Sequence, residues 1–240
     1  MTQQDQPGPQ DQQDRDSRIP DQRDLDVLSR QLGRPARDVV EIGARCVCGN
    51  PLVATTAPRL SNGIPFPTTY YLSHPIITAA VSRLEAEGVM TEMSDRLVTD
   101  AALAARYRAA HEAYLAARSA VGERAGTGPV PEIDGVSAGG MPTRVKCLHV
   151  LVGHALAAGP GMNPLGDEAI KRIAQWWTID RCYCDGAWDT TGQAPDTDLS
   201  RHTRTQGLTP EDLVAKRARR RGPTTPGPAL TTDAVSTEER

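Results

Sequence analysis

The sequence contains the motif Arg-Cys-x-Cys twice, and each copy is followed by residues typical of turns. The first motif supplies Cys46 and Cys48, and the second supplies Cys182 and Cys184. Four thiolates bind one tetrahedral zinc ion at Zn–S distances of about 2.3 Å, provided that the fold brings the two motifs together. A site of this kind stabilises a fold and performs no reaction. We therefore predict a zinc site with these four cysteines as ligands and with His74 as a substitute fourth ligand.

Two other interpretations of these cysteines remain open. The common zinc knuckle has two residues between its cysteines, whereas each motif here has one. Buried thiols can pack as small hydrophobic side chains, and a pair of cysteines can carry redox chemistry.

A second group of reactive side chains falls in a helix predicted over residues 142–158. At about 100° per residue, Cys147 and His154 lie on nearly the same face, about 10.5 Å apart along the axis. They can line one groove but cannot bind one ion. His149 projects about 140° away from His154, and for His149 we expect a structural role in the core.

Cys147 and His154 also suggest a nucleophile and its base. With His74 contributed from elsewhere in the chain, they would serve a hydrolase or a transferase beside the loop at residues 163–167. Such a pair must come within about 3 Å. This hypothesis predicts a closed polar pocket that joins the three side chains, and a Cys147 thiol that reacts faster than the others.

The elements that must position these residues begin with strands. Runs rich in β-branched residues at 39–45 and 52–56 flank a Gly/Asn turn at 46–51, and residues 68–72 form a third run. They predict one small antiparallel sheet.

Helical patterns precede and follow the sheet. Apolar residues recur at helical spacing in five segments. The first covers residues 24–32, the second covers 75–88 with Ser73 as the cap, and the third is one long helix that begins at Ser94 or Asp100 and ends at Val121. The last two cover 142–158 and 167–177, with Asp167 as the cap of the final helix. Strands followed by helices predict the α+β class, with a small antiparallel sheet and four or five helices packed on it.

Composition defines the limits of this domain. Residues 1–23 and 190–240 are rich in polar residues, Pro and Arg, and such segments bury too little apolar surface to fold. We therefore predict two disordered tails around a single α+β domain at residues 24–189.

Charge and hydropathy exclude several classes of protein. With 27 Lys and Arg against 30 Asp and Glu, the formal net charge of the 240 residues is −3, which is unlike a strongly basic nucleic-acid-binding protein. The one basic run, from Lys216 to Arg221, is expected to be solvated charge, although such a run can also contact nucleic acid or an anionic membrane.

The longest apolar stretch, residues 148–158, is shorter than the roughly 20 residues of a membrane-spanning helix. The first residues have neither a basic region nor an apolar core like those of a signal peptide, so we expect a cytoplasmic protein.

Several segments together resemble one bacterial family. They are GIPFPTTYYL at 63–72, HP at 74–75, SRLEA at 82–86, VKCLH at 145–149 with His154, and NPLGD at 163–167. Over roughly residues 39–177 the chain resembles the domain of unknown function 501 family, in the form found in high-GC Gram-positive bacteria. Other branches of this family resemble the chain but have Cys at the position of His74, an exchange that a metal site accepts.

The resemblance names no reaction. Genes of this family commonly lie near those for a septum-formation initiator and an exopolyphosphatase, which implies an adaptor in cell division or envelope growth as a further hypothesis. The leading hypothesis from the residues is a small zinc-binding accessory protein that acts through protein partners. The Cys147-based hydrolase or transferase is the alternative.

Overall fold

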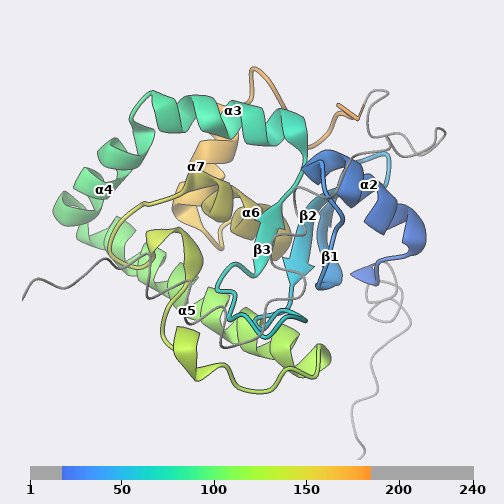
Figure 1. Ribbon diagram of the computed structural model, residues 1–240. Helices are drawn as coiled ribbons and strands as arrows, with labels where there is room; N and C mark the ends of the chain where they lie inside the picture. Colours follow the sequence, from blue (N-terminus) through green and yellow to red (C-terminus); the bar gives the residue numbers. More distant parts are fainter. Residues whose placement is uncertain (1–17, 185–240) are drawn as a thin grey trace, which may run out of the picture. The chain divides into compact units, whose positions relative to one another are not determined.

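The structure is a computed structural model that describes residues 18–184 (Figure 1). Residues 1–17 and 185–240 lie outside this part, and with them most of the two predicted tails and the basic run at 216–221. The helix α2 (Gln22–Leu32) begins inside the predicted N-terminal tail, because Asp21 and Asp24 form a reciprocal capping box at its start.

The three predicted strands form one antiparallel sheet. Its strands are β1 (Val39–Arg45), β2 (Pro51–Thr56) and β3 (Tyr70–Leu72), in the order β1-β2-β3. In the register of the sheet, Ile42 of β1 pairs with Ala54 of β2, and Ala54 pairs with Tyr71 of β3. Every residue of the central strand β2 is buried, so the sheet is covered on both faces.

The helices that follow the sheet confirm the α+β class. They are α3 (Pro75–Ala86), α4 (Val89–Thr99), α5 (Ala101–Arg124), α6 (Leu148–Ala158) and α7 (Pro164–Arg172). The apolar helix α6 packs against β3, and Gly166 of α7 lies so close to α6 that an added Cβ would stand 2.2 Å from the carbonyl oxygen of Leu151. Most buried apolar side chains of the described residues therefore form one core around α6, and Leu28, Ile42 and Ala54 form a second, smaller cluster where α2 meets the sheet. None of the helices described is both long enough and apolar enough to cross a membrane.

The predicted long helix is present in the form that begins at Asp100, although α5 ends at Arg124 instead of Val121 and a separate helix, α4, precedes it. Residues 89–124 form two helices, because Asp100 ends α4 and caps α5 by accepting a hydrogen bond from the backbone N–H of Leu103 at 2.9 Å.

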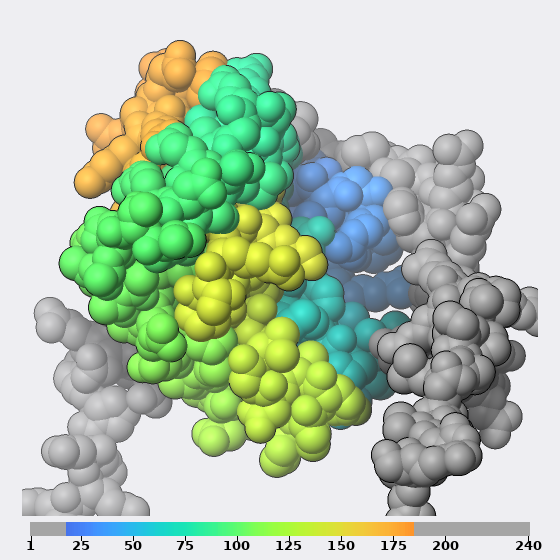
Figure 2. All heavy atoms as spheres, turned by 90° about the vertical axis from the view of Figure 1, so that its left-hand side faces the viewer, coloured from blue at the N-terminus to red at the C-terminus, as the bar shows by residue number. Residues whose placement is uncertain are grey.

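The predicted start of a helix at Pro142 was also wrong. The backbone N–H of Val145 donates to Ser94 Oγ at 3.0 Å, and that of Lys146 donates to the carbonyl of Gly139 at 2.7 Å. These groups are therefore engaged outside a helix, and α6 begins only at Leu148. The long connection from α5 to α6 lies across the face shown in Figure 2, between the green helices and the strand segments.

Two predicted helix caps differ as well. His74, not Ser73, directly precedes α3, and the Ser73 hydroxyl donates to Gln31 Oε1 at 2.8 Å. The cap of α7 is Asn163, whose Oδ1 accepts from the backbone N–H of Gly166, whereas Asp167 accepts from the N–H of Gly161.

Candidate functional site

The two Cys-x-Cys motifs meet in the fold. The sulfur atoms of Cys46, Cys48, Cys182 and Cys184 all lie within 4.8 Å of one another. Four sulfurs around a zinc ion at about 2.3 Å stand about 3.8 Å apart, so small movements of the side chains would close this group around an ion. We call these residues the four-cysteine site.

The first motif is the turn between β1 and β2. The N–H of Cys46 donates to the carbonyl of Asn50 at 2.8 Å, and the N–H of Gly49 donates to the carbonyl of Cys46 at 2.8 Å. Gly49 has φ +89°, a left-handed conformation that favours glycine. The sharp turn directs both cysteines to one place although only Val47 separates them.

The second motif follows α7 in a segment without helix or strand. This orange segment runs past the far side of α3 toward the β1–β2 turn (Figure 1). The N–H of Cys184 points to the sulfur of Cys182 at 3.4 Å, so the second motif also folds back on itself. Of the four cysteines, Cys46 and Cys184 are buried, and Cys48 and Cys182 are exposed.

Charged residues of α2 and β1 fix the first motif. Arg45 makes two hydrogen bonds with the carboxylate of Asp24, at 2.6 and 2.8 Å, and a third with the carbonyl of Gly49 at 2.9 Å. Arg23 donates to Asn50 Oδ1 at 3.0 Å. The hydrogen bond with Asp24 raises the pKa of Arg45, so the guanidinium stays charged and this ion pair ties the turn to α2.

His74 touches the four-cysteine site from outside it. The residue is fully buried, and its Nε2 lies 3.4 Å from the sulfur of Cys184. Burial lowers the pKa of His74 to about 4, so the ring is neutral and can donate one N–H to the sulfur. The structure thus places His74 against the sulfur of Cys184, and the four cysteines alone would make a complete tetrahedral ligand set. Burial, and then the neighbouring Cys48 and Cys46, raise the pKa of the Cys184 thiol well above its usual range in the metal-free protein.

Cys147 pairs with a different histidine from the one predicted. Its sulfur lies 3.8 Å from Nδ1 of His149, and the same nitrogen lies 3.1 Å from Oε1 of Glu85. Cys147 precedes α6 instead of lying in it, so the angular argument that grouped Cys147 with His154 does not apply. The contacts with Cys147 and Glu85 raise the pKa of His149 to about 9. His149 is therefore a partly exposed, charged residue, and its predicted role in the core was wrong.

His154 is the core histidine of α6. Its ring is buried, is parallel to Tyr70 with centroids 5.5 Å apart and is perpendicular to Tyr114 at 5.2 Å. Its Nδ1 accepts a hydrogen bond from the side-chain amide of Asn163 at 3.2 Å. Burial lowers the pKa of His154 to about 4, so the ring is neutral.

A cavity of about 340 Å³ opens beside Cys147. Besides Cys147 and His149, its lining residues are Thr68, Tyr70, Tyr71, Leu72, Thr78 and Val150. Neither His154 nor His74 is among them. The structure therefore places the three side chains of the predicted nucleophilic site in separate surroundings: Cys147 at this cavity, His154 in the core and His74 at Cys184.

Sequence reasoning missed Glu85. Its carboxylate reaches the start of α6 from α3, where Oε1 accepts from the backbone N–H of Leu148 at 2.7 Å. The residue belongs to the SRLEA segment noted above, but no spacing within the sequence connects position 85 with position 147.

Comparison with known families agrees with the resemblance seen in the sequence. The family model described as "Protein of unknown function (DUF501)" matches residues 42–171. This range contains Cys46, Cys48, His74 and the residues around Cys147, and it ends before Cys182. No curated protein and no solved structure matches the chain. Because the matched range exceeds half of the 240 residues, the chain belongs to the DUF501 family.

Proposed function

We propose that this protein binds one structural zinc ion through Cys46, Cys48, Cys182 and Cys184, and that it acts in the cytoplasm as an accessory protein for protein partners. The observation that carries the proposal is the convergence of four sulfurs from two distant motifs within 4.8 Å. Four thiolates are the ligand set of structural zinc sites. All five cysteines are free thiols, as is usual in a reducing compartment.

The ion would join the β1–β2 turn to the segment after α7. That segment has no regular secondary structure. Trp177 and Cys184 bury their side chains in the core, whereas Ile179 between them is exposed, so the ion would add a second attachment to the end of the segment. Metal coordination supplies folding free energy to segments of this kind.

Two features favour action through a partner over catalysis at this ion. A zinc ion with four protein ligands has no open position for a substrate. The turn that holds the ion also exposes the apolar side chain of Val47, which is 62% accessible between the two cysteines of the first motif. Contact with another protein would bury such a side chain.

The test is the zinc content of the full-length protein, purified under reducing conditions and dialysed against a weak chelator. We expect about one zinc ion per chain, and almost none in Cys46→Ser or in Cys182→Ser. Cys147→Ser is the matched control, because it removes a thiol elsewhere and should retain the ion. Zinc near zero in the unaltered protein, or zinc that persists in both motif variants, would contradict the proposal.

The family resemblance implies a more specific form of this proposal, in which the protein partner acts in cell division or envelope growth. Zinc-loaded protein and the Cys182→Ser variant would be compared as baits in cells after crosslinking. Division or envelope proteins captured only by the zinc-loaded bait would support this form, and their absence from both would contradict it. The alternative of a hydrolase or transferase built from Cys147, His154 and His74 gains no support from the separate surroundings of those residues.

A further inference from the structure

Three different ligand groups converge at the start of α6. A carboxylate oxygen of Glu85, the sulfur of Cys147 and a ring nitrogen of His149 all lie within 4.8 Å of one another. They come from two elements, since Glu85 belongs to α3 while Cys147 and His149 lie at the N-terminal end of α6. We call these residues the Cys147 site.

The neighbours of His149 determine which of its nitrogens faces this group. Its Nε2 lies 3.1 Å from the carbonyl oxygen of Thr78, and a carbonyl can only accept, so Nε2 carries a proton. In the neutral ring the lone pair of Nδ1 then points toward Cys147 and Glu85. Metal-binding histidines are oriented in the same way, by donating the second ring N–H to a backbone carbonyl or a carboxylate.

The other two ligand groups are also held in place. The backbone N–H of Leu148 donates to Oε1 of Glu85 at 2.7 Å, which keeps the carboxylate at the end of the helix. Cys147 is the residue that precedes α6, so its position is fixed by the start of the helix. Once a metal ion displaces the proton from Nδ1 of His149, three electron-pair donors would thus face one ion.

We infer that Glu85, Cys147 and His149 form a second metal site, with three protein ligands and a fourth position open to the neighbouring cavity. One sulfur, one nitrogen and one oxygen ligand suit zinc, which accepts all three types. Three protein ligands and one open position are typical of zinc sites that bind or transform a small molecule. This site is independent of the four-cysteine site and shares no residue with it.

The cavity indicates what would occupy the fourth position. Its volume of about 340 Å³ lies at the lower end of the usual range for small-molecule sites. Tyr70, Tyr71, Leu72 and Val150 give it a mainly apolar lining. We therefore expect water in the resting protein, and a small ligand that combines an apolar body with one carbonyl or carboxylate oxygen directed at the metal.

The competing interpretation is an ion pair without metal. In that case a proton occupies Nδ1 of His149, and the pair between Glu85 and His149, at 3.1 Å, only connects α3 with α6. The side chains of Glu85 and His149 are 23% and 26% exposed, so added metal ions have access to the site. A direct measurement of metal binding therefore distinguishes the metal site from the ion pair.

The experiment uses the full-length protein with zinc in the four-cysteine site, dialysed against a weak chelator and then titrated with Co²⁺. We expect saturation at about one added equivalent, with a thiolate-to-cobalt charge-transfer band about a quarter as intense as that of a four-thiolate site. Cys147→Ser should lose this band. Glu85→Gln, which can still accept the hydrogen bond of Leu148, and His149→Ala should bind little cobalt.

Two controls separate this result from the proposed zinc site and from loss of folding. Zinc-free Cys182→Ser and zinc-free Cys182→Ser with Cys147→Ser should differ, after titration with Co²⁺, by the same weak band, because any cobalt held by the remaining cysteines of the four-cysteine site is common to both. His111→Ala replaces another histidine that bonds a side chain, Ser137, and should bind cobalt like the unaltered protein. Absence of a cobalt band in the unaltered protein, or a band that persists in Cys147→Ser, would overturn the inference and leave the ion pair alone.

Discussion

At the scale of single residues, the surroundings of each histidine decide its charge. His149 lies between Cys147 and Glu85, which raise its pKa to about 9, so it is protonated at neutral pH in the metal-free protein. His74 and His154 are buried, and burial lowers the pKa of each to about 4. The three histidines therefore have different roles: His149 forms a salt bridge, His74 contacts the sulfur of Cys184, and His154 packs in the core.

His154 should make the stability of the protein depend on pH. Its pKa is about 4 in the folded protein, against 6.5 for an unperturbed histidine side chain, so between these values the unfolded chain binds a proton that the folded chain excludes. This contribution to the free energy of unfolding is complete above pH 6.5, declines as the pH falls toward 4 and then stays constant. We expect His154→Gln to be less stable at pH 7, but to lose about 2 kcal/mol less than the unaltered protein between pH 7 and pH 4.5.

Urea unfolding of both proteins at the two pH values measures this difference. All other titrating groups, including the four cysteines, are common to both proteins and cancel in the comparison. An identical loss of stability on acidification in the two proteins would show that His154 does not carry this linkage.

The contact of His74 with Cys184 predicts an effect on zinc affinity without an effect on zinc stoichiometry. A neutral ring that donates to a ligand sulfur stabilises the thiolate, and loss of such an outer contact costs about 10- to 100-fold in metal affinity. His74→Ala should therefore still bind one zinc ion at saturation, with weaker affinity in competition against a chelator. Loss of the ion at saturating zinc would instead make His74 a ligand, as the substitute role suggested by the sequence requires.

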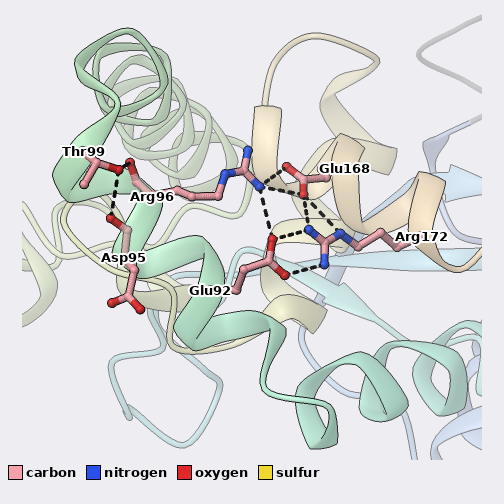
Figure 3. Close-up of polar contacts among 6 residues, drawn as sticks. All are labelled: Glu92, Asp95, Arg96, Thr99, Glu168 and Arg172. Carbon is pink, nitrogen blue, oxygen red and sulfur yellow. Dashed lines mark hydrogen bonds and ion pairs between the residues drawn. The ribbon is translucent and has the colours of Figure 1, made fainter.

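At the scale of elements, four charged side chains connect α4 with α7. Figure 3 shows Glu92 and Arg96 of α4 facing Glu168 and Arg172 of α7. Arg172 contacts Glu92 at 2.5 Å and Glu168 at 2.6 Å, and Arg96 contacts Glu168 at 2.8 Å. Each arginine therefore meets carboxylates of both helices, and the network holds α7 in place just before the second Cys-x-Cys motif begins.

The network should couple α4 to α7 in a way that salt weakens. Its members are partly exposed, so we expect a coupling of about 1 kcal/mol between Glu92 and Arg172 in a double-mutant cycle of Glu92→Gln and Arg172→Gln. The coupling should fall substantially in 1 M NaCl, where the Debye length is about 3 Å. A matched cycle of Asp95→Gln with Arg172→Gln, in which Asp95 is outside the dashed contacts to Arg172 in Figure 3, should show almost no coupling. Equal coupling in the two cycles would contradict a specific interaction.

An element could be predicted from the sequence where the residues that determine it lie close together in the chain. The strands and the β1–β2 turn follow from β-branched runs around a Gly/Asn pair, and these signals lie within a few residues of one another. The break between α4 and α5 depends on the capping hydrogen bond of Asp100, and the late start of α6 depends on the bond between Val145 and Ser94. The bond between Val145 and Ser94 joins residues far apart in the sequence, so no local sequence pattern predicts it.

At the scale of the whole molecule, the same reasoning separates the two candidate sites. The four-cysteine group was predictable because two copies of one motif suggest one ion, even though the distance between them had to come from the fold. The Cys147 site was not predictable, because Glu85 reaches it from α3 through tertiary packing. Sequence reasoning instead selected His154, which the structure places in the core between Tyr70 and Tyr114.

A zinc ion in the four-cysteine site would connect residues near both ends of the described part, and this makes the effects of its ligands non-additive. Removal of one ligand from either motif abolishes tight binding of the same ion, so Cys46→Ser and Cys182→Ser should each lower the free energy of unfolding by a similar amount. That amount is about 4 kcal/mol when free zinc exceeds the dissociation constant about 1,000-fold.

The double variant should be no less stable than either single variant, because the ion is already lost. Cys147→Ser combined with Cys182→Ser should instead be additive, since the two residues belong to separate sites. A chelator should lower the stability of the unaltered protein to that of the motif variants and leave those variants unchanged. Additive losses in Cys46→Ser with Cys182→Ser, measured by urea unfolding in excess zinc, would show that the two motifs stabilise the protein independently and would exclude one shared ion.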